Sequence, residues 1–259
     1  MSAPRAYLEA MAGVRKFLSR SAWAFFVAAL LLGGPAAAGS GKVLVELFTS
    51  QGCSSCPPAD RFLDELAERD DVIALSFHVD YWNYLGWRDP YSSPEATARQ
   101  RGYREALGLR YVYTPQMVIG GIDQAVGSGR GDVLSAIERR RGEAGLHIAV
   151  SHPAPGEALV TIAAGARPKS PAAVMLFAYD RRHVTEIRRG ENEGVKLVNR
   201  NVVRAHRRIG TWNGEQTTIR LSLKQLGITG QDGCAIVVQP EEGGAVYGAT
   251  AFAIPGRSG

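Results

Sequence analysis

Cysteines are scarce in this sequence. It has three in 259 residues, which form a single Cys-x-x-Cys motif, Cys53 to Cys56, and a separate Cys234. A structural zinc site needs further thiol or imidazole ligands at short spacing, and the sequence offers none. Internal repeats and low-complexity linkers are also absent, so the parts of the chain are expected to pack against each other. No apolar run beyond residue 38 is as long as a membrane-spanning helix.

The first 38 residues have the pattern of an export signal. Basic residues precede the 11-residue apolar run Ala22 to Leu32, and the small residues Ala36 and Ala38 mark a cleavage site. An uncleaved membrane anchor is the alternative, while the lack of a cysteine after the run argues against a lipid anchor. We therefore predict a signal peptide over residues 1–38 and a periplasmic or secreted protein. In such an oxidising compartment, a cysteine pair can rest as a disulfide.

Little positive charge remains once this leader is set aside. The formal net charge is +5, of which the leader contributes +3, so bulk charge predicts no nucleic-acid partner. One segment, Arg181 to Arg208, still has nine Lys and Arg residues against three Glu. Such a segment can recruit an acidic partner or anionic lipid headgroups. The alternative is a solvated strand face with cross-strand ion pairs.

The Cys-x-x-Cys motif follows a β-branched apolar run that starts at Val43. Pro57 and a helical pattern from Ala59 to Arg69 come directly after it, so both thiols are expected at the start of a helix. Unpaired N–H groups and the helix dipole stabilise a thiolate there. We predict that Cys53 is the more exposed nucleophile and Cys56 its resolving partner. Two structural cysteines, or half of a zinc site, are the alternatives.

The pattern up to residue 141 alternates strands and helices. A buried strand is predicted over Val72 to Val79, and Ser93 and Pro94 open a helix that ends near Gly108. Two short strands follow within residues 114–127, and a helix covers Asp132 to Arg141. The predicted order is β-α-β-α-β-β-α.

This order, with Cys-x-x-Cys at the first strand-to-helix junction and Thr114-Pro115 opening the third strand, resembles the thioredoxin fold. The resemblance implies that Pro115 is cis and lies against the active-site disulfide, where the backbone at Thr114 pairs with an extended substrate. More closely, the sequence resembles an exported bacterial family, domain of unknown function 1223, over residues 42 to 255. The strings that are similar to this family include Glu46 to Asp60, Phe77 to Trp82 and Tyr113 to Gln116.

The sequence departs from thioredoxin at two places. Ser54-Ser55 replaces the Gly-Pro between the cysteines, and this dipeptide helps to set redox poise, which leaves the direction of electron flow open. The position of thioredoxin's buried acid is Leu47 here. Glu46, one residue earlier, is a charge in a strand expected to be covered on both faces, and we predict a proton-shuttle role for it. A carboxylate paired with an Arg is the alternative.

Polar and aromatic residues follow the second predicted strand. His78 lies at its C-terminal end, where α/β sheets place their sites. His78 can join Cys53 and Cys56 as a soft metal ligand, although a hydrogen-bonded structural histidine is the alternative and no cofactor is predicted. The aromatic residues Tyr81, Trp82, Tyr84 and Trp87 are predicted to line a hydrophobic peptide groove, with Tyr81 and Trp82 as substrate-binding residues, and packing against the following helix is the alternative.

From Leu146 onward the pattern consists of β-rich runs separated by Pro, Gly and Asp turns. We predict a thioredoxin-like domain over residues 39–144 and an all-β sandwich-like domain over residues 145–259. Cys234 starts an apolar strand and is interpreted as a small core residue, with a third redox thiol as the alternative.

Together these features predict an exported thiol-disulfide oxidoreductase that acts on protein or peptide thiols and disulfides. The rival interpretation is a copper- or partner-binding module with a structural disulfide.

Overall fold

The computed structural model describes residues 41–143 and 145–255. The predicted signal peptide, residues 1–38, lies outside the described residues. Within the part that is described, no helix has both the length and the apolar character needed to cross a membrane.

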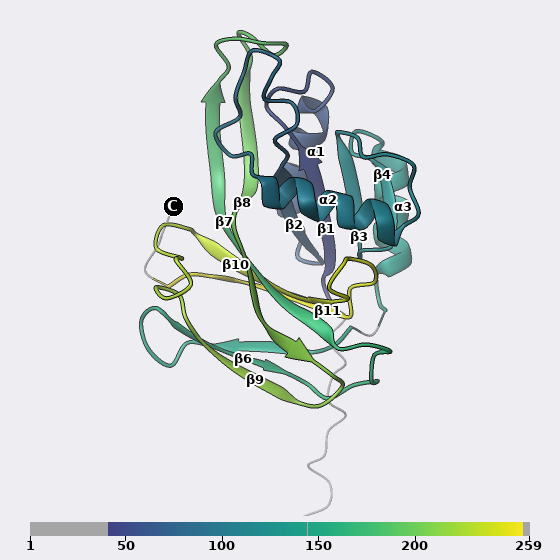
Figure 1. Ribbon diagram of the computed structural model, residues 1–259, viewed down its shortest axis with the longest axis vertical. Coiled ribbons are helices and arrows are strands. Elements are labelled where there is room, and N and C mark those ends of the chain that lie inside the picture. The colour runs from purple at the N-terminus through teal and green to yellow at the C-terminus, as the bar shows by residue number, and fades with distance from the viewer. Residues whose placement is uncertain (1–40, 144, 256–259) are drawn as a thin grey trace, which may run out of the picture. The chain divides into compact units, whose positions relative to one another are not determined.

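The first half of the described chain alternates strands and helices in the predicted order, β-α-β-α-β-β-α (Figure 1). Strand β1 pairs in parallel with β2 and antiparallel with β3, and β3 pairs antiparallel with β4. The elements are β1 (Val43–Thr49), α1 (Pro57–Ala67), β2 (Val72–His78), α2 (Pro94–Ala106), β3 (Gln116–Ile119), β4 (Asp123–Val126) and α3 (Arg130–Arg140).

The second half consists of strands, as the turn-rich sequence predicts. These are β5 (Ile148–Ser151), β6 (Glu157–Ile162), β7 (Ala172–Glu186), β8 (Lys196–Trp212), β9 (Thr217–Ser222), β10 (Gly233–Gln239) and β11 (Gly248–Ala253). Strands β5, β6 and β9 form a sheet of their own, and the other four join the sheet of the first half in the order β11-β10-β7-β8-β2-β1-β3-β4. The result is a mixed α/β fold in which a large sheet runs through both halves.

Residues 39–259 form one compact unit by their contacts. Strand β8 lies beside the outer edge of β2, with Val202 opposite Ser76. The large sheet therefore contains strands from both sides of the predicted domain boundary at residues 144 and 145. That the two parts are separate domains stays a prediction.

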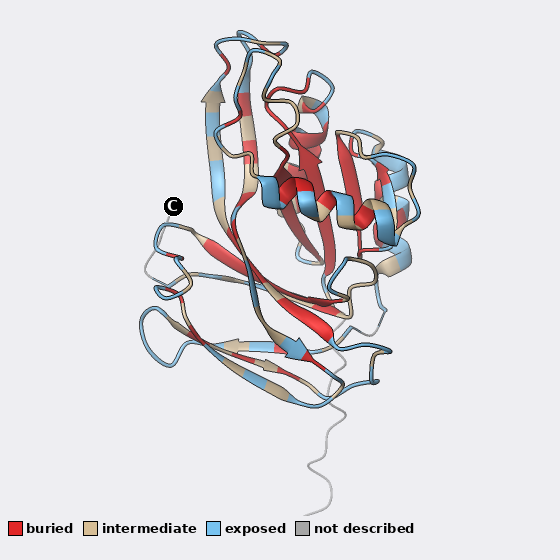
Figure 2. Cartoon of the chain, in the orientation of Figure 1, coloured by how far each residue is buried: buried red, intermediate tan, exposed pale blue. Residues whose placement is uncertain are grey.

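Strands β1 and β2 are buried along their whole length (Figure 2). Because side chains alternate along a strand, β1 sends Val45 and Leu47 to the face covered by α1 and α3, and Leu44 and Phe48 to the face covered by α2. A polar side chain in either strand is consequently cut off from bulk water.

The three-stranded sheet packs over β7 and β10 in a separate apolar core. Cys234 lies in this core with no exposed surface, next to Ile236 and Val238 of the same strand face. Burial raises the pKa of its thiol to about 12. The interpretation of Cys234 as a core residue is therefore confirmed, and its thiol is held in the unreactive, protonated form.

Candidate active site

Cys53 and Cys56 form a disulfide at the start of α1, with their Cα atoms 5.4 Å apart. Cys56 is the N-cap residue of the helix, and Pro57 occupies its first turn. The exposed fraction of Cys53 is 3% and that of Cys56 is zero. Cys53 is thus the more exposed of the two, as predicted, but only a small part of it is open to a partner.

Thr114 contacts the sulfur of Cys53, and Trp82 contacts Thr114 in turn. Thr114 Oγ1 donates a hydrogen bond to Cys53 Sγ at 3.2 Å, and Trp82 Nε1 donates to Thr114 Oγ1 at 2.7 Å. The Thr114–Pro115 peptide bond is cis. Of the two aromatic residues predicted to bind substrate, Trp82 takes part in this chain of hydrogen bonds. Tyr81 instead donates its hydroxyl to Gln100 of α2 at 3.0 Å.

The loop that precedes Cys53 is fixed by side chains distant in sequence. Gln51 donates its backbone N–H to Asp89 Oδ2 at 2.8 Å and accepts from Trp87 Nε1 at 3.1 Å. Asn192 lies between β7 and β8, and its Nδ2 donates to the carbonyl oxygens of Gln51 and Cys53 at 2.9 and 3.0 Å. The all-β half of the chain therefore contributes directly to the cysteine loop, which the sequence analysis did not foresee.

A buried group of polar side chains lies between α1 and the sheet. His78 Nδ1 is 2.7 Å from Asp89 Oδ2, and neither side chain has exposed surface. Burial alone would lower the pKa of His78, but the carboxylates of Asp89 and Asp60 raise it above its ordinary value. Burial would likewise raise the pKa of Asp89, but His78 and backbone N–H groups hold it below its ordinary value. His78 and Asp89 thus form a buried histidine–carboxylate pair, in keeping with the interpretation of His78 as a hydrogen-bonded histidine.

Asp60 is the third titratable member of this group, and the sequence analysis missed it. It is 4% exposed, and burial raises its pKa to about 7, although His78 acts to lower it. Its backbone N–H donates to the carbonyl of Cys56, one helical turn earlier, at 3.1 Å. The signal was present in the sequence, since Asp60 falls between Cys56 and Leu63 on the stripe of α1 that faces the sheet.

Several polar atoms of this region are buried without a hydrogen-bonding partner among the described residues. They are Thr49 Oγ1, Asp60 Oδ2, Ser76 Oγ, His78 Nε2, Asn199 Nδ2 and Arg200 Nε. Thr49 and His78 are directly opposite each other in the ladder of β1 and β2. Thr49 and Asn199 offer donors that favour the charged form of Asp60, but neither makes a hydrogen bond of ordinary length with it. Unpaired buried polar atoms are costly, so a cluster of six such atoms is unusual for a protein interior.

Glu46 lies away from this cluster, on the face of β1 that α2 covers. It has no exposed surface, pairs with Arg99 Nε at 2.5 Å and accepts a hydrogen bond from Tyr103. Arg99 also contacts Gln239 of β10 at 3.1 Å. The structure therefore does not bring Glu46 together with the predicted catalytic cysteines. It shows the Arg-paired carboxylate that the sequence analysis gave as the alternative to a proton shuttle.

No group of three or more His, Cys, Asp or Glu side chains in the described part of the chain is arranged to hold a metal ion. His78 uses Nδ1 on Asp89, and its Nε2 has no partner there. The alternative ligand set of Cys53, Cys56 and His78 is thus not assembled in this structure.

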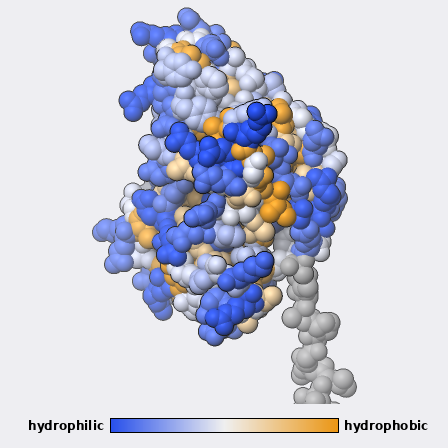
Figure 3. Space-filling model, turned by 45° about the vertical axis from the view of Figure 1, so that its right-hand side comes forward, coloured by the Kyte–Doolittle hydropathy of each residue, from blue (hydrophilic) through white to orange (hydrophobic). Residues whose placement is uncertain are grey.

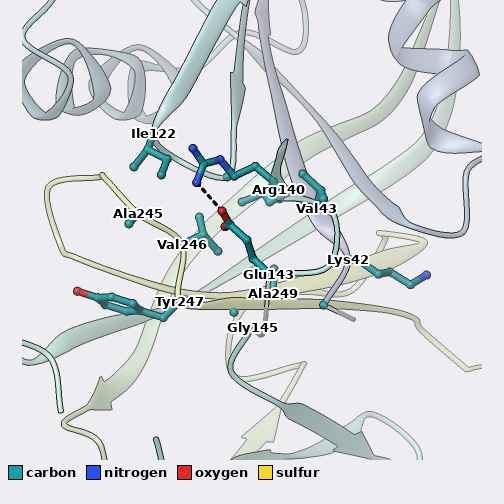
Figure 4. A pocket seen from close by; sticks show the side chains of 14 residues that line it. Lys42, Val43, Ile122, Arg140, Glu143, Gly145, Ala245, Val246, Tyr247 and Ala249 are labelled. Atoms are coloured by element: carbon teal, nitrogen blue, oxygen red, sulfur yellow. Dashed lines mark hydrogen bonds and ion pairs between the residues drawn. The ribbon is translucent and has the colours of Figure 1, made fainter. Parts of the chain in front are cut away.

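The best-formed cavities in the described part of the chain are not lined by Cys53 or Cys56. One of about 100 Å³ lies beside the start of β1, the opposite end of the strand from Cys53, and contains an ion pair between Arg140 and Glu143 (Figure 4). One face of the molecule is largely hydrophilic, with several separate apolar patches (Figure 3). Tyr84, one of the predicted groove residues, is 76% exposed.

The basic segment Arg181 to Arg208 covers the end of β7, most of β8 and the connection between them. Ion pairs join Arg200 to Glu68, Arg204 to Asp180 and Arg208 to Glu241. Part of its positive charge is therefore neutralised within the molecule.

The comparisons with known proteins agree with the resemblance seen in the sequence. The family described as "Protein of unknown function (DUF1223)" matches residues 44–239. A crystal structure of a protein from Agrobacterium tumefaciens is similar, with 34% identity and a TM-score of 0.72 over 85% of this chain and 97% of that one. HBP35 of Porphyromonas gingivalis has a TM-score of 0.56 at 12% identity, over 85% and 77% of the two chains, which shows a shared fold alone. No curated protein matches the chain.

Proposed function

The chain belongs to the DUF1223 family of proteins of unknown function, and we propose that it is an exported, thioredoxin-like thiol-disulfide oxidoreductase. The observation that supports this most is the disulfide at the N-terminus of α1, whose outer sulfur, on Cys53, accepts a hydrogen bond from Thr114. A donor at 3.2 Å and the helix N-terminus both favour the thiolate of Cys53 over the thiol. The pair is therefore suited to cycle between disulfide and dithiol.

The reaction is thiol-disulfide exchange. A client thiolate attacks Cys53 Sγ, a new sulfur–sulfur bond forms to the client, and the electron pair of the broken bond passes to Cys56 Sγ. A second client thiolate then displaces Cys53, so the client dithiol is oxidised and the protein disulfide is reduced. The reverse sequence reduces a client disulfide. Thr114 and Pro115 border Cys53, where the backbone of an extended client is expected to bind.

Trapping tests this proposal. In a Cys56→Ser variant the mixed disulfide on Cys53 cannot be resolved, so covalent adducts should accumulate when Cys53 attacks the disulfide of a client protein, or of oxidised glutathione as a small probe, and releases one thiolate. Replacing Cys53 as well should abolish them. Cys234→Ser in the same background is the matched control, because a thiol buried in the core should make no difference to the adducts.

A structural disulfide is the second candidate function, and the burial of both cysteines favours it. In that case no adduct forms on Cys56→Ser, the wild-type disulfide resists reduction by glutathione, and reduction costs about 2–4 kcal/mol of stability. Measuring the reduction potential separates the two cases, since structural disulfides have potentials well below that of the glutathione pool.

Export and an acidic client complete the proposal. Mass spectrometry of the protein from the periplasm or medium should find a chain that begins at Gly39, which would establish cleavage after Ala38.

The basic segment is proposed to steer acidic clients, and this steering should weaken as ionic strength rises.

A further inference from the structure

We infer that Asp60 is the proton donor and acceptor for the sulfur of Cys56, and that the His78–Asp89 pair sets its protonation state. The inference rests on the proposed exchange reaction and assigns it a residue outside the Cys-x-x-Cys motif. Asp60 is four residues after Cys56 on the same helix, and side chains with this spacing are neighbours on one face. Both residues are buried against the sheet.

Cys56 has no exposed surface. When the disulfide opens, the leaving thiolate of Cys56 is therefore out of reach of bulk water, and an unpaired buried charge is strongly unfavourable. A proton has to come from a group inside the protein. The titratable side chains of the buried cluster next to α1 are Asp60, His78 and Asp89. Among these, His78 and Asp89 are paired with each other, whereas Asp60 Oδ2 has no hydrogen-bonding partner within residues 41–143 and 145–255.

The electrostatic surroundings of Asp60 suit it to proton transfer. Burial raises its pKa to about 7, so near neutral pH it is both a ready donor and a ready acceptor of a proton. The groups that act on it come from every element packed around it: His78 from β2, Asp89 from the β2–α2 connection, Thr49 from β1 and Asn199 from β8. Arg204 of β8 acts on His78 in turn, and Arg200 pairs outward with Asp64 and Glu68 of α1.

The proton can stay inside the site over a full cycle. When a client thiolate opens the disulfide, Cys56 Sγ receives the electron pair and Asp60 transfers its proton to it, leaving a thiol and a carboxylate. When the protein is reoxidised, Asp60 takes the proton back as Cys56 attacks Cys53 in the mixed disulfide, and the client leaves as a thiolate. The positive charge on His78 stabilises the carboxylate between these two steps.

An aryl disulfide that releases a coloured thiolate, dithiobis(nitrobenzoate), resolves the two steps in stopped flow. Starting from the reduced protein, the first colour phase reports attack by Cys53 and the second reports attack by Cys56 on the mixed disulfide. In an Asp60→Asn variant the second phase should slow about 100-fold at neutral pH, while the first stays within about threefold, because only the second needs the internal base. In His78→Gln the pH midpoint of the second phase should rise, because loss of the positive charge raises the pKa of Asp60.

Asp64→Asn is the matched control, since Asp64 lies one turn further along α1 with its side chain 44% exposed. It should leave both phases unchanged. An Asp60→Asn protein whose second phase has the wild-type rate and pH profile overturns the inference, as does equal slowing of both phases, which indicates a structural role only. A wild-type protein that forms no mixed disulfide contradicts the proposed function, and the inference with it. A reacting wild type with an unaffected Asp60→Asn contradicts the inference alone.

Discussion

Glu46 and Asp60 are both buried carboxylates, but they differ in their hydrogen-bonding partners, which indicates a structural role for Glu46 and a chemical role for Asp60. Glu46 has a guanidinium at 2.5 Å and a tyrosine hydroxyl as partners. Asp60 Oδ2 has no partner within hydrogen-bonding distance in the described part of the chain. Burial without a partner raises the pKa of Asp60 to about 7, so it can exchange a proton near neutral pH. Asp60 is for this reason the better placed of the two to move a proton.

Glu46→Gln should destabilise the protein by about 3–5 kcal/mol, because it leaves Arg99 buried without a counter-charge. Urea denaturation measures this loss. Glu65→Gln, the control, breaks an exposed pair with Arg130 and should leave the urea midpoint close to that of the wild type, because solvent screens such pairs. If Glu46→Gln unfolds like the wild type but loses cysteine reactivity, the proton-shuttle role predicted from the sequence is supported instead.

The raised pKa of Asp60 also predicts how stability depends on pH. Its ordinary value is 3.8 and its value in the folded protein is about 7, so between these limits the folded state binds more protons than the unfolded state. Stability from this group therefore falls as pH rises from 4 to 7, by up to about 4 kcal/mol. The unfolding free energies of wild type and Asp60→Asn should be measured over this range. As pH rises, the wild type should lose stability relative to Asp60→Asn. A constant difference would show that Asp60 does not titrate there.

At the scale of elements, the connection between β7 and β8 is part of the cysteine site. It brings Asn192 onto the carbonyl groups of Gln51 and Cys53, and Ser54 donates its backbone N–H to Glu191 at 3.3 Å. Gln51 also donates to Asn199 in β8 at 2.9 Å. A long hairpin from the second half of the chain thus holds the conformation of the loop that ends in Cys53.

Asn192→Ala should leave two buried carbonyl groups with fewer donors and cost about 1–3 kcal/mol. The freed loop should also change the reduction potential of the disulfide, which is measured by equilibration with glutathione. Glu193→Ala, one residue further along and exposed, is the control and should change neither quantity. An unchanged potential in Asn192→Ala would limit the hairpin to a purely stabilising role.

At the scale of the whole molecule, the two halves share the large sheet. The outer edge of β2 is covered by β8, and Phe77 of β2 packs edge-on against Phe177 of β7, with ring centroids 5.4 Å apart. An isolated first half would expose this strand edge and these rings to water, and such edges promote aggregation.

We therefore expect a fragment of residues 39–144 not to fold independently. Circular dichroism and urea denaturation of the fragment should show no cooperative transition, whereas residues 39–259 should unfold cooperatively. A fragment that unfolds cooperatively and still undergoes thiol exchange would instead support the domain boundary predicted from the sequence.

Much of the local architecture could be predicted because it depends on short-range signals. Pro57 and the Cys-x-x-Cys mark the start of α1, Ser93 caps α2 by accepting from the backbone N–H of Ala96, and the apolar runs mark β1 and β2. The contact of Thr114 with Cys53 was implied by family resemblance rather than by spacing, since 61 residues separate the two.

The sequence by itself determined the element order, the disulfide-forming motif at a helix start and the buried position of Cys234, because periodicity, capping and local composition act within a few residues. Only the tertiary structure decided which carboxylate lies under the cysteine helix, that Glu46 is neutralised by Arg99, and that Asn192 holds the Cys53 loop. The contacts of Glu46 and Asn192 join side chains that are 53 and 141 residues from their partners in the chain. Burial and pairing at such contacts, rather than residue type, decide the pKa and the role of each group.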